Sequence, residues 1–227
     1  DYKNENIDFV FIQRKERLSL GEHMNFLLKS VNCRWITWIG DDDLLSISYL
    51  SFVLKIINSG DVNIQGIQPG SSIDENQDIT EKEFYSLAIQ DEVVQSELKK
   101  KYHDINSNDI IDIINRGTQL SGLVYRKNII DQADKWLPNK NLFPWVCYQI
   151  VALREGNIVA LVGTHAKITN DTPKLFSYRR DGLLSEISEA IICGFSPDIK
   201  LGSYYAGRVI REIAFWRIFK TSKTGIG

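Results

Sequence analysis

An apolar stretch that ends directly in three aspartates constrains this chain more than any other feature. Residues 34–39 (RWITWI) are largely apolar and β-favouring, which predicts a buried strand, and Gly40, Asp41, Asp42 and Asp43 follow at once. Adjacent carboxylates repel one another, and a buried carboxylate is costly unless it is paired or bound to a metal. A hard divalent cation such as Mg²⁺ or Mn²⁺ removes that cost, because it prefers oxygen ligands.

The position of the aspartates allows two interpretations. In open α/β sheets, ligands bind beyond the carboxyl ends of the strands, where Asp41 and Asp43 would face one way and Asp42 the other. Alternatively, the aspartates begin the helix that follows, where each would gain about 0.3–1 kcal/mol from the helix dipole. A helix start accounts for one aspartate better than for three. Both interpretations stay open from the residues alone.

Alternating strand and helix signals around the cluster predict an α/β fold. Ser19 and Glu22 have the spacing of a capping box, and apolar residues at helical spacing follow them. A second helix is expected at residues 46–58, with strands at 7–12 and 62–67. This order of elements predicts a mostly parallel sheet flanked by helices.

The second half of the chain is less regular. Further helices are expected at residues 81–101, 110–115, 142–155 and 204–220, and strands at 120–125 and 158–162. We expect one domain over residues 1–170, followed by a helical C-terminal extension over residues 171–227. An aromatic cluster is expected mainly in the core, although such rings also stack on sugars. Its members are Trp136, Phe143, Trp145 and Tyr148.

Composition and charge exclude several classes of protein. The net charge of −2 argues against broad electrostatic contact with nucleic acid. The three scattered cysteines and three isolated histidines fit neither a disulfide framework nor a zinc site. No apolar run approaches the roughly 20 residues that span a bilayer, and no signal peptide is visible. A cytoplasmic location is therefore expected.

Two motifs resemble the family 2 glycosyltransferases of the GT-A fold. The first combines residues 21–25 (GEHMN) with residues 34–45 (RWITWIGDDDLL). Its ending is similar to the abequosyltransferase-like branch, which builds bacterial surface polysaccharides. The second motif, residues 120–127 (LSGLVYRK), resembles a strand near the acceptor in that branch. The resemblance covers residues 7 to 165.

The resemblance implies transfer of a sugar from a nucleotide-diphosphate donor to a hydroxyl of a saccharide or lipid-linked saccharide. Mg²⁺ or Mn²⁺ would bridge the two phosphates and stabilise the leaving diphosphate. By the resemblance, Asp43 and Asp41 bind the metal, and Asp41 or Asp42 holds the donor. Gly21 and Asn25 match positions near the donor nucleotide, although Asn25 also suits the solvated side of a helix.

The chain departs from the family pattern in two places. Family members begin with a strand, loop and helix that hold the nucleotide base, and none of these is visible before residue 7. This chain alone is therefore expected to bind UDP or another nucleoside diphosphate weakly or not at all. The family's acidic motif, which supplies the catalytic base, corresponds to residues 141–149 (NLFPWVCYQ), where no acid occurs. Asp131, Asp134 and His165 remain as candidates for the base. The simpler interpretation makes them two surface carboxylates and a structural histidine.

Residues 204–220 mix basic and aromatic side chains, which suits peripheral contact with an anionic membrane surface. The residues concerned are Tyr204, Tyr205, Arg208, Arg211, Phe215, Trp216, Arg217 and Lys220. Lipid-linked acceptors would place the enzyme at the inner face of the plasma membrane. The basic residues do not fall on one face, so an ordinary packed helix is the simpler interpretation.

Two alternatives to glycosyl transfer stay open. One is a Mg²⁺-dependent nucleotidyltransferase, which also places acidic residues after a strand. The other is a non-catalytic or degenerate GT-A-like domain that acts with a partner chain.

Overall fold

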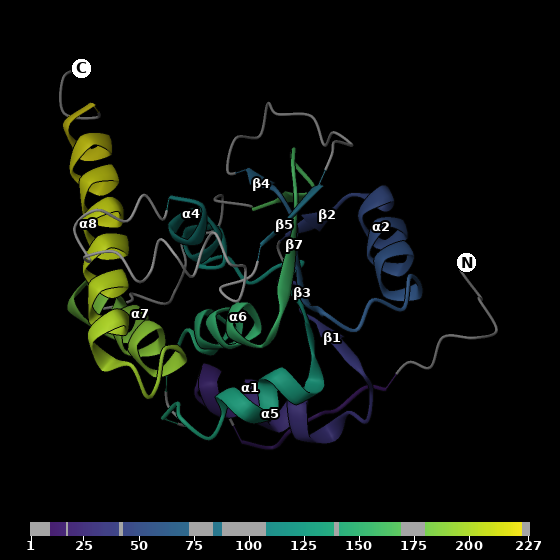
Figure 1. The fold of residues 1–227 in the computed structure, drawn as a ribbon. Coiled ribbons are helices and arrows are strands. Elements are labelled where there is room, and N and C mark those ends of the chain that lie inside the picture. The colour runs from purple at the N-terminus through teal and green to yellow at the C-terminus, as the bar shows by residue number, and fades with distance from the viewer. Residues whose placement is uncertain are drawn as a thin grey trace.

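Helices cover both faces of a central sheet, which confirms the predicted α/β class (Figure 1). The computed structural model describes residues 10–16, 18–40, 43–72, 84–87, 108–138, 141–168 and 180–223. The described helices are α1 (Leu20–Ser30), α2 (Ile47–Asn58), α4 (Asn108–Arg116), α5 (Lys127–Ala133), α6 (Pro144–Glu155), α7 (Arg180–Gly194) and α8 (Ile199–Lys223). The described strands are β1 (Trp35–Thr37), β2 (Leu44–Leu45), β3 (Ile64–Gln68), β4 (Ser71–Ser72), β5 (Phe84–Leu87), β6 (Val124–Arg126), β7 (Asn157–Leu161) and β8 (Ala166–Lys167).

The central sheet has the strand order β1-β6-β3-β7-β5, and a small sheet has the order β2-β8-β4. In the central sheet only β3 and β7 pair in parallel, and the other described pairs are antiparallel. The prediction of a mostly parallel sheet is therefore wrong. The predicted order strand, helix, strand around α2 correctly gives β1 and β3 the same direction. However, β6 lies between them and runs in the opposite direction, although it comes from much later in the chain.

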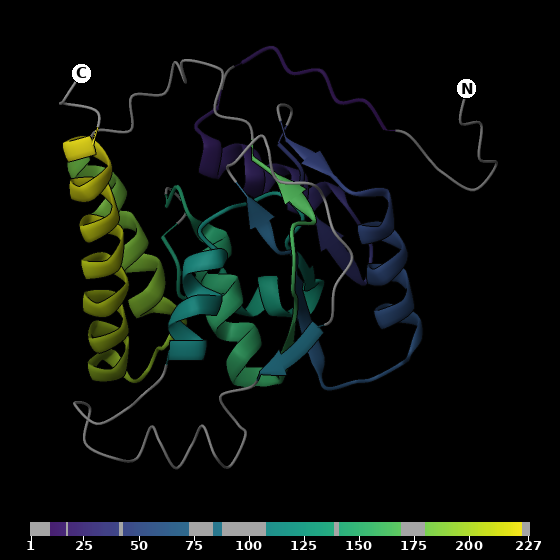
Figure 2. The same ribbon diagram turned by 90° about the horizontal axis from the view of Figure 1, so that it is seen from above.

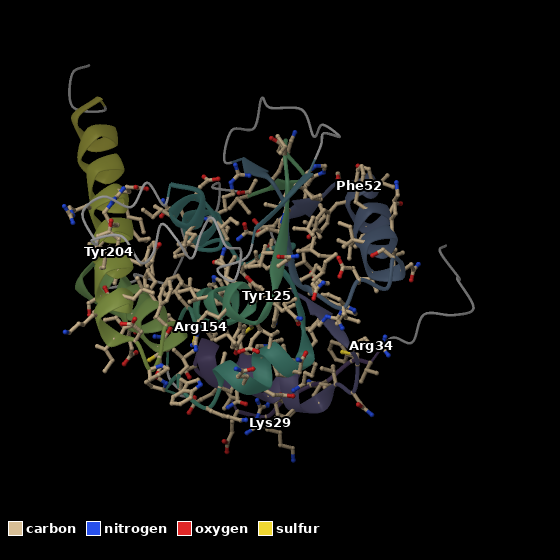
Figure 3. The ribbon with its side chains drawn as sticks, in the orientation of Figure 1. Lys29, Arg34, Phe52, Tyr125, Arg154 and Tyr204 are labelled. Atoms are coloured by element: carbon tan, nitrogen blue, oxygen red, sulfur yellow. The ribbon has the colours of Figure 1, made fainter. Side chains whose placement is uncertain are left out.

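The helices lie in layers on either side of the sheet. Figure 2 shows α2 on one side and α4 and α6 on the other, with α7 and α8 packed outside them. Helix α6 is buried on nearly all sides from Pro144 to Leu153, as expected for a helix enclosed between two layers. In Figure 3, Tyr125 of β6 lies in the middle of the molecule, where its ring contacts Trp38 and Tyr148.

Most predicted elements occur close to their expected positions, and two do not. Residues Val10–Ile12 belong to no described strand, and Val10 and Phe11 are exposed. The rest of the strand expected at 7–12 lies outside the described residues. A helix was expected at residues 81–101, but residues 84–87 form strand β5, which pairs antiparallel with β7. The rest of that range lies outside the described residues.

The aromatic cluster is mainly core, as expected. Phe143, Trp145 and Tyr148 are buried, whereas Trp136 is about half exposed. Helices α7 and α8 contribute Ile191, Tyr205 and other buried side chains to the same core as α6. No helix of the described chain combines the length and the apolarity needed to cross a membrane.

Helix α1 begins with the predicted capping box. The Ser19 Oγ accepts from the Glu22 backbone N–H at 3.3 Å, and the Glu22 carboxylate accepts from the Ser19 N–H at 3.0 Å. We expect Ser19→Ala to lower the free energy of unfolding by about 1 kcal/mol, because helix N–H groups lose an acceptor. Urea unfolding measures this. Ser30→Ala at the other end of α1, where the Oγ donates to the Phe26 carbonyl, should change stability by less than about 0.5 kcal/mol. Equal effects of the two substitutions would contradict the capping role.

Candidate functional site at the strand ends

Strands β1, β3 and β7 run in one direction, so their carboxyl ends meet at one edge of the central sheet. The antiparallel β6 begins at that edge. In Figure 1 the small sheet, with β2 and β4, lies near this end of the central sheet. We call the group formed by Gly40, Asp43, Gly70, Ser121 and Gly122 the strand-end site. It occupies the position where open α/β sheets bind ligands.

Asp43 is tied to the strand ends by Ser121. The buried Ser121 hydroxyl accepts from the Gly40 backbone N–H at 2.8 Å and donates to the Asp43 Oδ2 at 2.5 Å. The Ser121 side chain, which comes just before β6, therefore holds both the backbone after β1 and the direction of the Asp43 carboxylate. Asp43 itself is half-buried, so this carboxylate lies at the boundary between protein and solvent.

The backbone around Asp43 is held by buried contacts. The Gly122 N–H donates to the Trp38 carbonyl at 2.8 Å, and its own carbonyl accepts from the hydroxyl of Tyr49 on α2. Gly122 has a φ of +85°, which a residue with a Cβ rarely adopts. Burial raises the pKa of Tyr49, so this phenol stays protonated as a donor. The strand-end site is therefore built on a fixed frame.

Gly70, after β3, holds the loop that follows β7 against the strand-end site. Its carbonyl accepts from the N–H groups of His165 and Ala166 at 2.7 and 3.0 Å. A Cβ at Gly70 would lie 1.5 Å from the Gly163 carbonyl oxygen, so the two loops touch through their backbones. Only glycine fits at this contact.

Of the three aspartates in the metal prediction, the structure describes only Asp43. Asp43 lies at the expected edge, whereas Asp41 and Asp42 lie outside the described residues. Among the side chains that the structure describes, no three from His, Cys, Asp or Glu form a group that could hold a metal ion. A single carboxylate at this edge still fits Mg²⁺, which proteins often hold through one or two carboxylates with phosphate oxygens and waters completing the shell.

Two candidates for the catalytic base make contacts that suit the simpler, structural interpretation. His165 is fully buried, and its ring lies 6.1 and 6.0 Å from the rings of Tyr49 and Phe52. Full burial in contact with aromatic rings is typical of a structural histidine. Asp131 pairs with Lys127 one turn away on the exposed side of α5, as surface carboxylates commonly do.

The remaining candidates meet in a separate pocket. Gly21 and Asn25 of α1 line it together with Asp134, after α5, and Tyr148 of α6. Asp43 contributes nothing to this lining. The structure thus divides the predicted site residues between two places, with Asp43 at the strand ends and Gly21 and Asn25 beside Asp134.

The sequence indicates no contact between Ser121 and Asp43, and it leaves Tyr148 between core packing and stacking on a sugar. Ser121 lies in the second motif but contacts Asp43 across 78 positions of the chain. The Tyr148 hydroxyl donates to Asp134. No pattern in a single sequence links residues so far apart.

Comparison with known proteins adds no relative: neither a protein-family model nor a curated protein matches this chain.

Proposed function

We propose that this chain is a GT-A-like glycosyltransferase that transfers a sugar from a nucleotide-diphosphate donor to a hydroxyl of a saccharide or lipid-linked saccharide. The observation that carries the proposal is the Asp43 carboxylate at the strand-end edge, held by Ser121.

The position of Asp43 supports a role in binding the donor diphosphate. Open α/β sheets bind ligands at this edge, beyond the carboxyl ends of the strands. Gly40, after β1, and Gly122, before β6, lie next to the Ser121–Asp43 hydrogen bond in the chain. Asp43 would bind a Mg²⁺ or Mn²⁺ ion that also contacts the donor diphosphate. By the resemblance, Asp41 would be a second ligand of that ion.

The proposed reaction exchanges one bond for another at the anomeric carbon of the donor sugar. The acceptor oxygen bonds to that carbon, the bond to the diphosphate oxygen breaks, and the acceptor proton passes to a base. A bound divalent cation supplies charge stabilisation of the leaving diphosphate. Ser121 keeps the Asp43 carboxylate oriented, which reduces the reorganisation that binding requires.

The test is release of nucleoside diphosphate from a panel of UDP-, GDP-, CDP- and dTDP-sugars with saccharide acceptors. We expect release that needs both Mn²⁺ or Mg²⁺ and an acceptor, and that EDTA abolishes. Pyrophosphate release from a nucleoside triphosphate and a sugar phosphate would instead indicate nucleotidyl transfer. Turnover that is unchanged by EDTA would contradict the metal-dependent mechanism.

A further inference from the structure

Strand β1 forms one edge of the central sheet, and its outer side has no strand beside it among the residues that the structure describes. In that part of the chain β1 pairs only with β6. The Arg34 and Trp38 carbonyls accept from backbone N–H groups next to β6, at 2.9 and 2.8 Å. Because alternate residues of a strand direct their backbone groups to opposite sides, those of Trp35, Thr37 and Ile39 point outward.

The side chains along this edge favour pairing with a further strand. Trp35, Thr37 and Ile39 are uncharged residue types that favour strands, and Thr37 and Ile39 are exposed. Edge strands are commonly protected by lysine, proline or a bulge, because their free N–H and C=O groups otherwise pair with another chain. This edge carries none of these protections. Residues Val10–Ile12, where a strand was expected, are exposed and form no described strand.

Opposite charges lie at the two ends of this edge. At its start, Arg34 is exposed and forms no ion pair with a described residue (Figure 3). The Arg126 Cζ lies 4.6 Å from the centre of the Trp35 ring, which adds a second positive charge. At the other end, Gly40 is followed in the sequence by the three aspartates at 41–43. Antiparallel pairing of two such strands brings the positive start of each beside the acidic end of the other, so the charges fit a second copy of this chain.

One register pairs all the outward groups of the edge. With a two-fold axis at Thr37, this residue lies opposite itself, and Trp35 of one copy lies opposite Ile39 of the other. Thr–Thr pairs and pairs of an aromatic with a β-branched residue stabilise antiparallel strands. The same register sets Arg34 opposite Gly40 of the second copy, at the beginning of its acidic cluster.

We propose that β1 pairs antiparallel with β1 of a second copy, so that the central sheets of two chains join across a two-fold axis at Thr37. The proposal concerns assembly and does not depend on sugar transfer. It also places Arg34 of each copy beside the strand-end site of the other, which begins at Gly40.

The first test is sedimentation equilibrium of the unsubstituted chain. The average mass should rise from that of one chain toward that of two as the concentration increases through the micromolar range. Thr37→Lys should weaken the dimer by about tenfold or more, because it sets two ammonium groups opposite each other at the axis. The matched control is Thr37→Val, which keeps an uncharged, strand-favouring side chain and should dimerise as the unsubstituted chain does. Circular dichroism reports whether each variant is folded.

A second pair of variants tests the charges at the ends of the edge. Arg34→Glu should weaken the dimer by about tenfold or more, because it faces the acidic cluster of the other copy twice in each dimer. Lys55→Glu makes the same change of charge at an exposed position of α2 and should leave the dimer intact. Added salt should weaken the unsubstituted dimer, since exposed charges are screened.

Disulfide trapping tests the register. In a chain with Cys33→Ser, Thr37→Cys should form a covalent dimer with oxidised glutathione, because Cα atoms about 5.5 Å apart in such a pair suit a disulfide. Ser51→Cys, at an exposed position of α2, is the matched control and should stay uncrosslinked. The proposal is overturned if the chain stays monomeric at every concentration, which would leave the edge to some other strand. It is also overturned if Thr37→Lys and Arg34→Glu leave a dimer intact, or if trapping occurs at position 51 and not at 37.

Discussion

Asp43→Asn should lower metal-dependent sugar transfer by roughly 100-fold or more, because removing a direct ligand should cost at least as much as removing the groups that orient ligands. The amide has nearly the same shape as the carboxylate, so Ser121 can still donate to it. The substitution removes the charge that a divalent cation needs and leaves the packing unchanged. The assay is release of nucleoside diphosphate over a range of Mn²⁺ concentrations, with melting temperature measured in parallel.

Two further variants sharpen this result. Ser121→Ala keeps the charge but frees the carboxylate, so we expect a smaller loss, about 10- to 100-fold, that higher Mn²⁺ partly restores. The matched control is Asp112→Asn, which weakens an i,i+4 pair with Arg116 on α4, outside the strand-end site. It should keep full activity. An Asp43→Asn variant with unchanged metal dependence would exclude Asp43 as a ligand.

Gly70→Ala should lower the free energy of unfolding by about 3 kcal/mol or more, which is at the upper end for overpacking. The added Cβ would lie 1.5 Å from the Gly163 carbonyl oxygen, and backbone cannot move aside as a flexible side chain can. Separating the two loops would also break the hydrogen bonds from His165 and Ala166 to the Gly70 carbonyl. Urea unfolding gives the change in stability.

The control for this substitution is Gly207→Ala in α8. A Cβ at Gly207 meets nothing within 4 Å, so alanine should stabilise the helix by up to about 1 kcal/mol. The two substitutions add the same methyl group, and they are expected to change the free energy of unfolding in opposite directions. A Gly70→Ala variant within about 0.5 kcal/mol of the unsubstituted chain would show that the β3–β7 loops are not in contact as described.

Local signals predicted the elements, because the interactions that form them are themselves local. The capping box of α1 links residues three apart, and Gly156 ends α6 directly after its last turn. Sheet order depends on distant pairings instead. Nothing in residues 124–126 indicates that they form a strand between β1 and β3. This insertion and the antiparallel pairing of β5 with β7 make the sheet mixed.

The candidate site, like the fold, could be predicted from the sequence only where it depends on neighbouring residues. The acidic cluster directly after an apolar strand correctly placed Asp43 beyond β1, since that inference needs only the neighbouring residues. Its partner Ser121 and the pocket that gathers Asn25, Asp134 and Tyr148 depend on tertiary packing. The resemblance assigned Asn25 and Asp43 to one site, whereas in the folded chain Asn25 lines a pocket to which Asp43 does not contribute.

Paramagnetic broadening by Mn²⁺ tests the central claim most directly. In NMR spectra of the ¹⁵N-labelled chain with Mn²⁺ and a nucleoside diphosphate, the amides of Gly40, Ser121 and Gly122 should broaden first, and Asp43→Asn should abolish the effect. This measurement detects weak binding as well as tight binding. Broadening centred elsewhere, or none at the strand-end site at saturating Mn²⁺ and nucleotide, would contradict the assignment of Asp43 to a metal–diphosphate site.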